Sequence, residues 1–150
     1  MKFTPHEIKY VIQHDNNLIN KFAENSYSSF DYAKVLNFGK DGNKIPEPII
    51  YSIAKNEEYS FHYANALNFG KDGVNVPQFI INSIAEDKNF SFYYAKALNF
   101  KNIPIPIYNT LKNINLLPPD ATIKNDNVNE FYKYNYRSSY VTLVENIIKK

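Results

Sequence analysis

Residues 60–69 read SFHYANALNF, and nearly the same ten residues stand 31 positions earlier, at 29–38, and 31 positions later, at 91–100. All three segments follow the pattern S-F-x-Y-A-x-V/A-L-N-F. Agreement over ten residues, in three copies at constant spacing, marks an internal repeat. A period of this length is typical of proteins built by stacking one supersecondary unit on the next.

The similarity extends beyond these segments. The motif GKDG at 39–42 returns at 70–73. Three pairs of an apolar residue and proline follow, the third after a four-residue deletion: Ile45-Pro46, Val76-Pro77 and Ile103-Pro104. An apolar stripe recurs with the same period: Leu18, Ile19, Phe22 and Ala23 in a degenerate first copy, then Ile49, Ile50, Ile53 and Ala54, then Ile80, Ile81, Ile84 and Ala85. The third copy keeps Ile107, Tyr108 and Leu111.

Each copy contains two helical patterns. In 29–38 the small and apolar residues share one broad arc of a helix, with Asp31, Lys34 and Phe38 opposite. A serine at the start of each such segment is predicted as the N-cap, because its side chain can accept a bond from a first-turn amide: Ser29, Ser60 and Ser91. Gly39 and Gly70 are predicted to stop the helix, since glycine adopts left-handed backbone without strain.

The second helix of each copy is predicted to begin at the proline, which suits a first turn that needs no amide hydrogen. Tyr59 and Phe90 stand just before the next Ser-initiated segment and are predicted to staple that turn. A short helix pair with one apolar face buries that face only by stacking on its neighbours. The sequence therefore predicts an all-α fold, with short antiparallel helix pairs of period 31 stacked as a small α-solenoid with atypical capping ends.

We expect one domain over 1–150. Its divisions are an N-terminal cap with the degenerate first copy at 1–28, repeats at 29–58, 60–89 and 91–113, and a C-terminal cap at 114–150. Within the caps, 5–13, 128–136 and 139–150 carry further helical patterns.

The S-x-x-Y-A pattern, with a proline about a dozen residues on, resembles short helical repeats of uncharacterised phage and bacterial proteins. The resemblance covers residues 18–111. It rests on Ser29, Tyr32, Ala33 and Pro46 and their copies Ser60, Tyr63, Ala64, Pro77, Ser91, Tyr94, Ala95 and Pro104. In a general way the chain is also similar to longer-period α-solenoids such as HEAT repeats. The resemblance implies a helical scaffold, with a viral source as one alternative, and it implies no activity.

Composition excludes several function classes. The chain has no cysteine, which rules out disulfides, thiolate metal sites and cysteine nucleophiles. The net charge of +2 is too small to indicate a nucleic-acid partner by itself. No apolar run has membrane-spanning length and no signal-peptide pattern opens the chain. We expect a cytoplasmic protein without a membrane association, in the host cytoplasm if the chain is viral.

No combination of residues indicates catalysis. His6, His14 and His62 stand apart, without metal-ligand spacing, and His62 falls on the outward arc of its helix. The GKDG motif joins two predicted helices and lacks the Ser/Thr of a phosphate-binding loop. The carboxylate pairs at 57–58 and 86–87 fall at predicted solvated turns, where nothing raises a carboxyl pKa for acid catalysis. We therefore expect no enzyme activity, no cofactor and no metal.

Two recurring residues leave alternatives open. The asparagine that ends each first helix either ties the following turn or forms a row on a binding surface: Asn37, Asn68 and Asn99. The phenylalanine after it either packs under the next elements or forms an exposed aromatic ridge: Phe38, Phe69 and Phe100.

The preferred functional hypothesis is a non-catalytic module that binds a protein partner, a phage-encoded modulator of a host protein being one form of it. Outward positions that differ between repeats are the candidate contacts: Asp31, His62 and Tyr93, and Lys34, Asn65 and Lys96. The alternative is a nucleic-acid or nucleotide binder, because aromatic and basic residues alternate near the C-terminus at Tyr132, Lys133, Tyr136 and Arg137. An open apolar end would also allow a homo-oligomer.

Overall fold

The computed structural model describes Thr4 and residues 16–124. Within these residues the chain is all-helical, with seven α-helices and no strand, so the predicted all-α class is confirmed there. The α-helices are α2 (Asn16–Phe22), α3 (Ser26–Val35), α4 (Glu47–Ile53), α5 (Glu57–Ala66), α6 (Gln78–Ala85), α7 (Lys88–Ala97) and α8 (Ile105–Asn113). Two short 3-10 helices, η1 (Asn37–Gly39) and η2 (Asn68–Gly70), follow α3 and α5. Across the described part of the chain, every helix is too short or too polar to cross a membrane.

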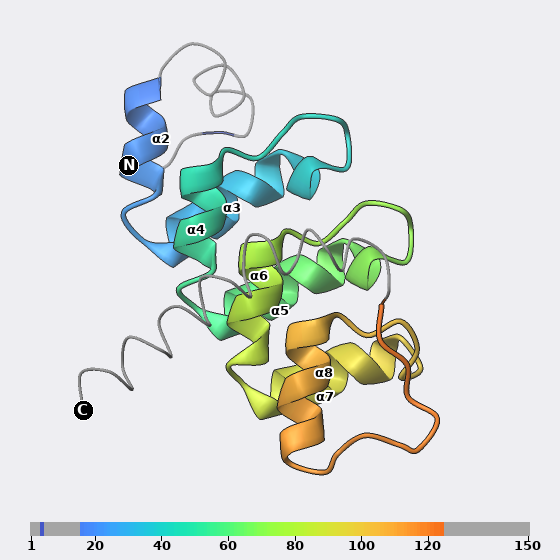
Figure 1. Cartoon of the computed structure of the whole chain (residues 1–150). Coiled ribbons are helices and arrows are strands. Elements are labelled where there is room, and N and C mark those ends of the chain that lie inside the picture. The colour runs from blue at the N-terminus through green and yellow to red at the C-terminus, as the bar shows by residue number, and fades with distance from the viewer. Residues whose placement is uncertain (1–3, 5–15, 125–150) are drawn as a thin grey trace, which may run out of the picture.

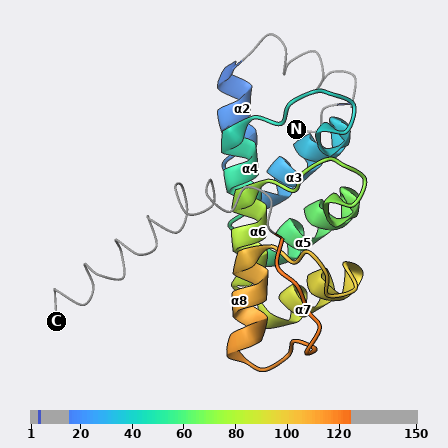
Figure 2. The same ribbon diagram turned by 45° about the vertical axis from the view of Figure 1, so that its right-hand side comes forward.

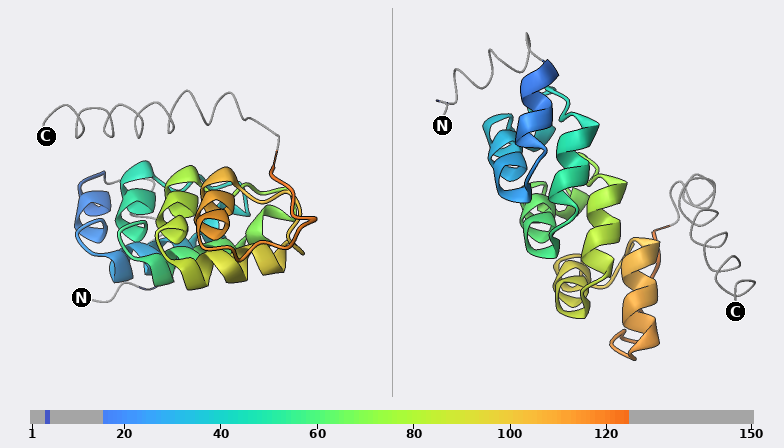
Figure 3. Two further views of the ribbon diagram at one scale, coloured as in Figure 1. Left: turned by 60° about the horizontal axis from the view of Figure 1, so that its bottom comes forward. Right: turned by 90° about the vertical axis from the view of Figure 1, so that its left-hand side faces the viewer.

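The helices lie in two layers. Helices α3, α5 and α7 form one layer, called the first layer, and α2, α4, α6 and α8 follow one another along the second layer (Figure 2). The views from below and from the side show the same two rows (Figure 3). Packing is closest between α3 and α4, α5 and α6, and α7 and α8. The loops that leave α3, α5 and α7 all project to one side of the molecule (Figure 1).

The first-layer helices are capped by Asn or Asp residues, which were not predicted from the sequence. The side-chain oxygens of Asn25, Asn56 and Asp87 accept bonds from the amides three residues on, at 2.7, 2.9 and 2.9 Å. The prediction that Ser29, Ser60 and Ser91 cap these helices was wrong. An Asn or Asp stands four residues before each serine, so the first turn is already formed when the serine is reached.

The three serines instead join consecutive helices. Each is fully buried, and each hydroxyl donates to a carbonyl at the C-terminal end of the preceding helix. The bonds run from Ser29 to Phe22 (2.8 Å), from Ser60 to Ile53 (3.3 Å) and from Ser91 to Ile84 (3.0 Å). Ser60 also lies 2.9 Å from the Ser83 hydroxyl. These bonds satisfy the buried hydroxyls and link each first-layer helix to the end of the helix before it.

The core runs the length of the molecule between the two layers. From the first layer it takes a tyrosine and an alanine of each sequence copy: Tyr32, Tyr63, Tyr94, Ala33, Ala64 and Ala95. From the second layer it takes the isoleucine stripe, including Ile49, Ile53, Ile80, Ile84 and Ile107. The alanines are completely enclosed, which agrees with close approach of helices at these positions.

The turns after α3, α5 and α7 use left-handed backbone at residues other than glycine. Asn37 and Phe38 have φ of 52° and 55°, and the same geometry returns at 68–69 and 99–100. A left-handed phenylalanine costs about 1–2 kcal/mol. The ring offsets this cost by packing on the core tyrosine of the next first-layer helix, with centroids 5.1 Å apart for Phe38–Tyr63.

These turns resolve the two open alternatives. All three phenylalanines are half-buried and packed against the core, so they do not form an exposed ridge. Asn37 Nδ2 donates to the Asp41 carboxylate at 3.3 Å, and Asn68 to Asp72 at 3.1 Å, so these two asparagines tie their turns. Asn99 lacks this bond because the deletion removed the equivalent aspartate.

Candidate binding surface

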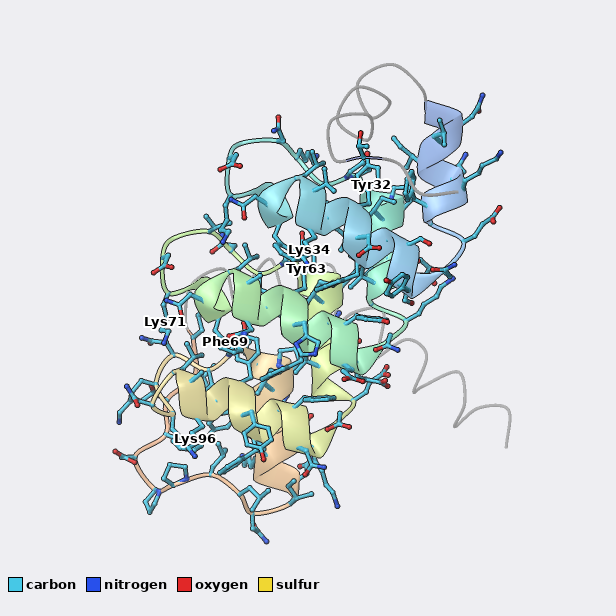
Figure 4. All side chains as sticks on the ribbon, turned by 180° about the vertical axis from the view of Figure 1, so that it is seen from behind. Tyr32, Lys34, Tyr63, Phe69, Lys71 and Lys96 are labelled. Atoms are coloured by element: carbon cyan, nitrogen blue, oxygen red, sulfur yellow. The ribbon has the colours of Figure 1, made fainter. Side chains whose placement is uncertain are left out.

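Five of the six outward residues predicted from the repeat are exposed, and Asp31 is half-buried. They come from three neighbouring helices of one layer: Asp31 and Lys34 from α3, His62 and Asn65 from α5, Tyr93 and Lys96 from α7. Figure 4 looks onto this layer and labels Lys34 and Lys96. We call these six residues together with the exposed Tyr27 the outer face. The helices bring the predicted residues onto one side of the molecule.

Two stacked aromatic pairs join the helices beneath the outer face. Phe30 of α3 stacks on Tyr59 of α5, with centroids 5.4 Å apart and planes 27° apart. Phe61 of α5 stacks on Phe90 of α7 at 5.1 Å and 23°. Tyr59 and Phe90 lie in the first turns of their helices, not before them as predicted. Their partners are one helix away, which a local staple pattern does not reveal.

The exposed rings of the outer face rest on these pairs. The centroid of His62 lies 6.5 Å from that of Phe30, and Tyr93 lies 6.5 Å from Phe61. Tyr27 lies 6.3 Å from Tyr59. Tyr27 and Tyr93 remain 63% and 54% exposed. The surface therefore presents large rings whose inner edges are supported and whose outer edges face solvent.

The charges of the outer face are mixed. Lys34 and Lys96 are exposed and flank the neutral Asn65. His62 Nε2 lies 3.8 Å from a Glu58 oxygen, in an exposed pair within one helix. Glu57 and Glu58 lie in the first turn of α5, where carboxylates suit the positive end of the helix, and not in a preceding turn as predicted. Such a surface can offer rings and ammonium groups to a partner.

Two observations concern the ionisable side chains of the described residues. Within residues 16–124 no three His, Asp or Glu side chains come together as a metal site. Burial raises the pKa of Tyr32 to about 12 and raises the pKa of Tyr63 and Tyr94 further, so all three stay neutral at physiological pH. The Tyr32 hydroxyl is buried without a hydrogen-bond partner in the described structure.

A further aromatic pair lies on the second layer and was missed in the sequence. Tyr51 of α4 is 54% exposed and Phe79 of α6 is 40% exposed, with their rings edge to face at 5.7 Å. The Lys55 ammonium lies 5.2 Å from the centre of the Tyr51 ring. The sequence did indicate its exposure. Tyr51 is two residues from both Ile49 and Ile53, which places it on the side of the helix opposite the apolar stripe.

The alternative site at Tyr132, Lys133, Tyr136 and Arg137 lies outside the described residues, as do the helical patterns at 5–13, 128–136 and 139–150. Comparison with protein-family models, with curated proteins and with solved structures finds no match to this chain.

Proposed function

We propose that this chain is a non-catalytic interaction module, a small α-solenoid of period 31 whose outer face binds a protein partner. One observation carries the proposal. Exposed Tyr27, His62 and Tyr93 each contact a ring of the stacked aromatic pairs that join three helices. Aromatic side chains fixed before binding lose little conformational entropy on contact, and Tyr is enriched among the residues that dominate interface energies.

The regular placement of the helices supports the solenoid part of the proposal. Helices α3, α5 and α7 begin at Ser26, Glu57 and Lys88, so successive helices of this layer start 31 residues apart. Equivalent serines, tyrosines and alanines take equivalent buried places. Packing of each unit on the next would share one interior along the stack.

The partner is expected to offer apolar groups to the rings and carboxylates to Lys34 and Lys96. Lys34 and Lys96 form no ion pair with any described residue, which favours contact with an acidic protein surface that would steer the encounter. The resemblance to phage repeat proteins extends the proposal to a host protein as this partner.

The experiment captures partners from a native lysate with the full chain tagged at either end. The recovered protein is then titrated against variants by calorimetry. Tyr93→Ala should weaken binding by about tenfold or more, because the loss of one anchor ring removes roughly 1.4 kcal/mol of binding free energy. Tyr51→Ala is the matched control, because Tyr51 is equally exposed, at 54%, on the other layer. It should bind as the wild type does.

Equal losses for Tyr93→Ala and Tyr51→Ala would refute the outer face as the contact. Failure to recover a partner through either tag would count against the whole function. Retention of an oligonucleotide in place of a protein, lost as salt rises, would replace this proposal with the nucleic-acid alternative.

A further inference from the structure

A cavity of about 690 Å³ opens between the loop after α5 and the loop after α7. Its walls come from the loop after α5, from α6 and α7, and from the short loop before α8. Figure 4 labels Phe69 and Lys71, which line it where the loops leave the first layer. The volume falls within the range of roughly 300–1,000 Å³ common to small-molecule sites. The outer face does not contribute to it.

The cavity wall formed by the third copy follows from the four-residue deletion. The loop after α7 reaches Pro104 without the residues equivalent to Asp72–Asn75. Its main chain pairs instead with the segment that returns after α8, which runs beside it in Figure 1. The Ile103 amide donates to the Thr122 carbonyl at 2.9 Å, and the Lys124 amide to the Ile103 carbonyl at 2.8 Å. These bonds fix the main chain of Lys124 at the cavity.

Three lysines line the cavity and no carboxylate does: Lys71, Lys101 and Lys124. The Lys71 ammonium donates to the Ala97 carbonyl at 3.0 Å, which holds it at the wall. Lys101 lies 3.2 Å from the Asp120 carboxylate, which balances part of its charge. Lys124 forms no ion pair with any described residue. A concave surface lined by one sign of charge attracts ligands of the opposite sign.

The remaining lining is suited to an organic ligand. Asn75 and Asn102 are exposed and supply amide groups. The apolar part comes from Phe69, Val76, Ile81, Leu98 and Pro104. The Phe69 ring is fixed against Tyr94, with centroids 5.0 Å apart. A ligand that used both parts would carry several negative charges at one end and a flat apolar group at the other.

We propose that this cavity binds a small organic polyphosphate with an aromatic ring, the chemistry of a nucleoside di- or triphosphate. The three ammonium groups meet the phosphates as point charges, and charged hydrogen bonds of this kind are stronger than neutral ones. The ring lies on the apolar floor beside Phe69. The site is distinct from the outer face, so the two proposals stand or fall separately.

The test is calorimetric titration of the full chain at low salt with ATP in the absence of magnesium. We expect saturable one-to-one binding. Pyrophosphate and adenosine, which carry the two halves of the ligand, should each bind at least tenfold more weakly than ATP. Lys71→Gln and Lys124→Gln should each weaken ATP binding by roughly three- to tenfold, as expected for loss of one charged contact at a partly solvated site.

Lys40→Gln is the matched control. Lys40 holds the position of Lys71 in the preceding GKDG motif, is exposed, and is not part of the cavity lining. It should leave ATP affinity within about twofold of the wild type, which is the change that general charge loss alone would cause. Asn75→Trp, at an exposed lining residue, should block ATP and leave the melting temperature unchanged.

Four results would overturn the proposal. The first is no saturable binding of ATP. The second is equal weakening by Lys40→Gln and Lys71→Gln, which would mean diffuse attraction. The third is pyrophosphate binding as tightly as ATP, which would show that the aromatic part of the ligand contributes nothing to binding. The fourth is a poly-glutamate peptide that binds more tightly than ATP with the same lysine dependence, which would make the cavity a polypeptide site.

Discussion

Helices α3, α5 and α7 contribute to two regions that differ in what they tolerate: the buried core between the layers, called the seam below, and the outer face. At the seam the three sequence copies hold identical residues, one serine, one tyrosine and one alanine each, all buried. On the outer face the equivalent positions hold Asp31, His62 and Tyr93. Close packing restricts each of these seam positions to one residue type, whereas the solvent-exposed positions of the outer face accept many residue types. Residue choice on the outer face is therefore free to serve binding.

The largest effect should come from the centre of the seam. Ile80→Ala removes a completely buried side chain from α6 and is expected to lower the free energy of unfolding by about 2–5 kcal/mol. Asn65→Ala, on the exposed side of α5, should change it by less than about 0.5 kcal/mol. Urea unfolding followed by circular dichroism measures both. Similar values for the two variants would show that the layers do not share a continuous core.

A smaller loss is expected for the serine that joins helices. Ser60→Ala leaves the Ser83 hydroxyl without its buried partner and should cost about 1–3 kcal/mol. The Ile53 carbonyl loses the bond from Ser60 and keeps the one from the Asn56 amide. Ser28→Ala is a suitable control, because Ser28 is half-buried at the start of α3 and takes part in capping through its amide alone. If both variants unfold at the same urea concentration, the serine bonds do not hold the helices together.

A still smaller effect tests the revised helix start. Asn56→Ala removes the side-chain oxygen that accepts from the Tyr59 amide at 2.9 Å and should cost about 1 kcal/mol. Asn56→Ser should recover most of this loss, since serine is also a good N-cap. A full loss with both variants would assign the role of Asn56 to something other than capping.

The repeat predicted the helices well because the apolar stripes at Ile49 and Ile80 report burial directly. It misplaced the caps even though Asn25, Asn56 and Asp87 share the same spacing, because the capping position varies between Asn and Asp whereas the serine four residues later is invariant. The left-handed Phe38 and Phe69 follow from packing on the next helix, which overrides local preference. The cavity depends on the pairing of Ile103 with Thr122 and Lys124, a contact between distant residues that no local pattern encodes.

The smallest effect at neutral pH should be that of Tyr32→Phe, which keeps the ring and removes a buried hydroxyl that has no partner among the described residues. The free energy of unfolding should change little or rise slightly at pH 8, because no hydrogen bond is lost.

Burial raises the Tyr32 pKa from 10.0 to about 12, so the folded state favours the protonated phenol. This contribution to stability is complete below pH 10 and is lost as the pH rises through 12. Urea unfolding at pH 8 and pH 11 should therefore show the wild type losing more stability than Tyr32→Phe, and Tyr63→Phe should shift in the same direction, because burial also raises the pKa of Tyr63. Identical pH dependence in the wild type and both variants would mean that these phenols reach solvent. The seam beneath the outer face would then be open to water.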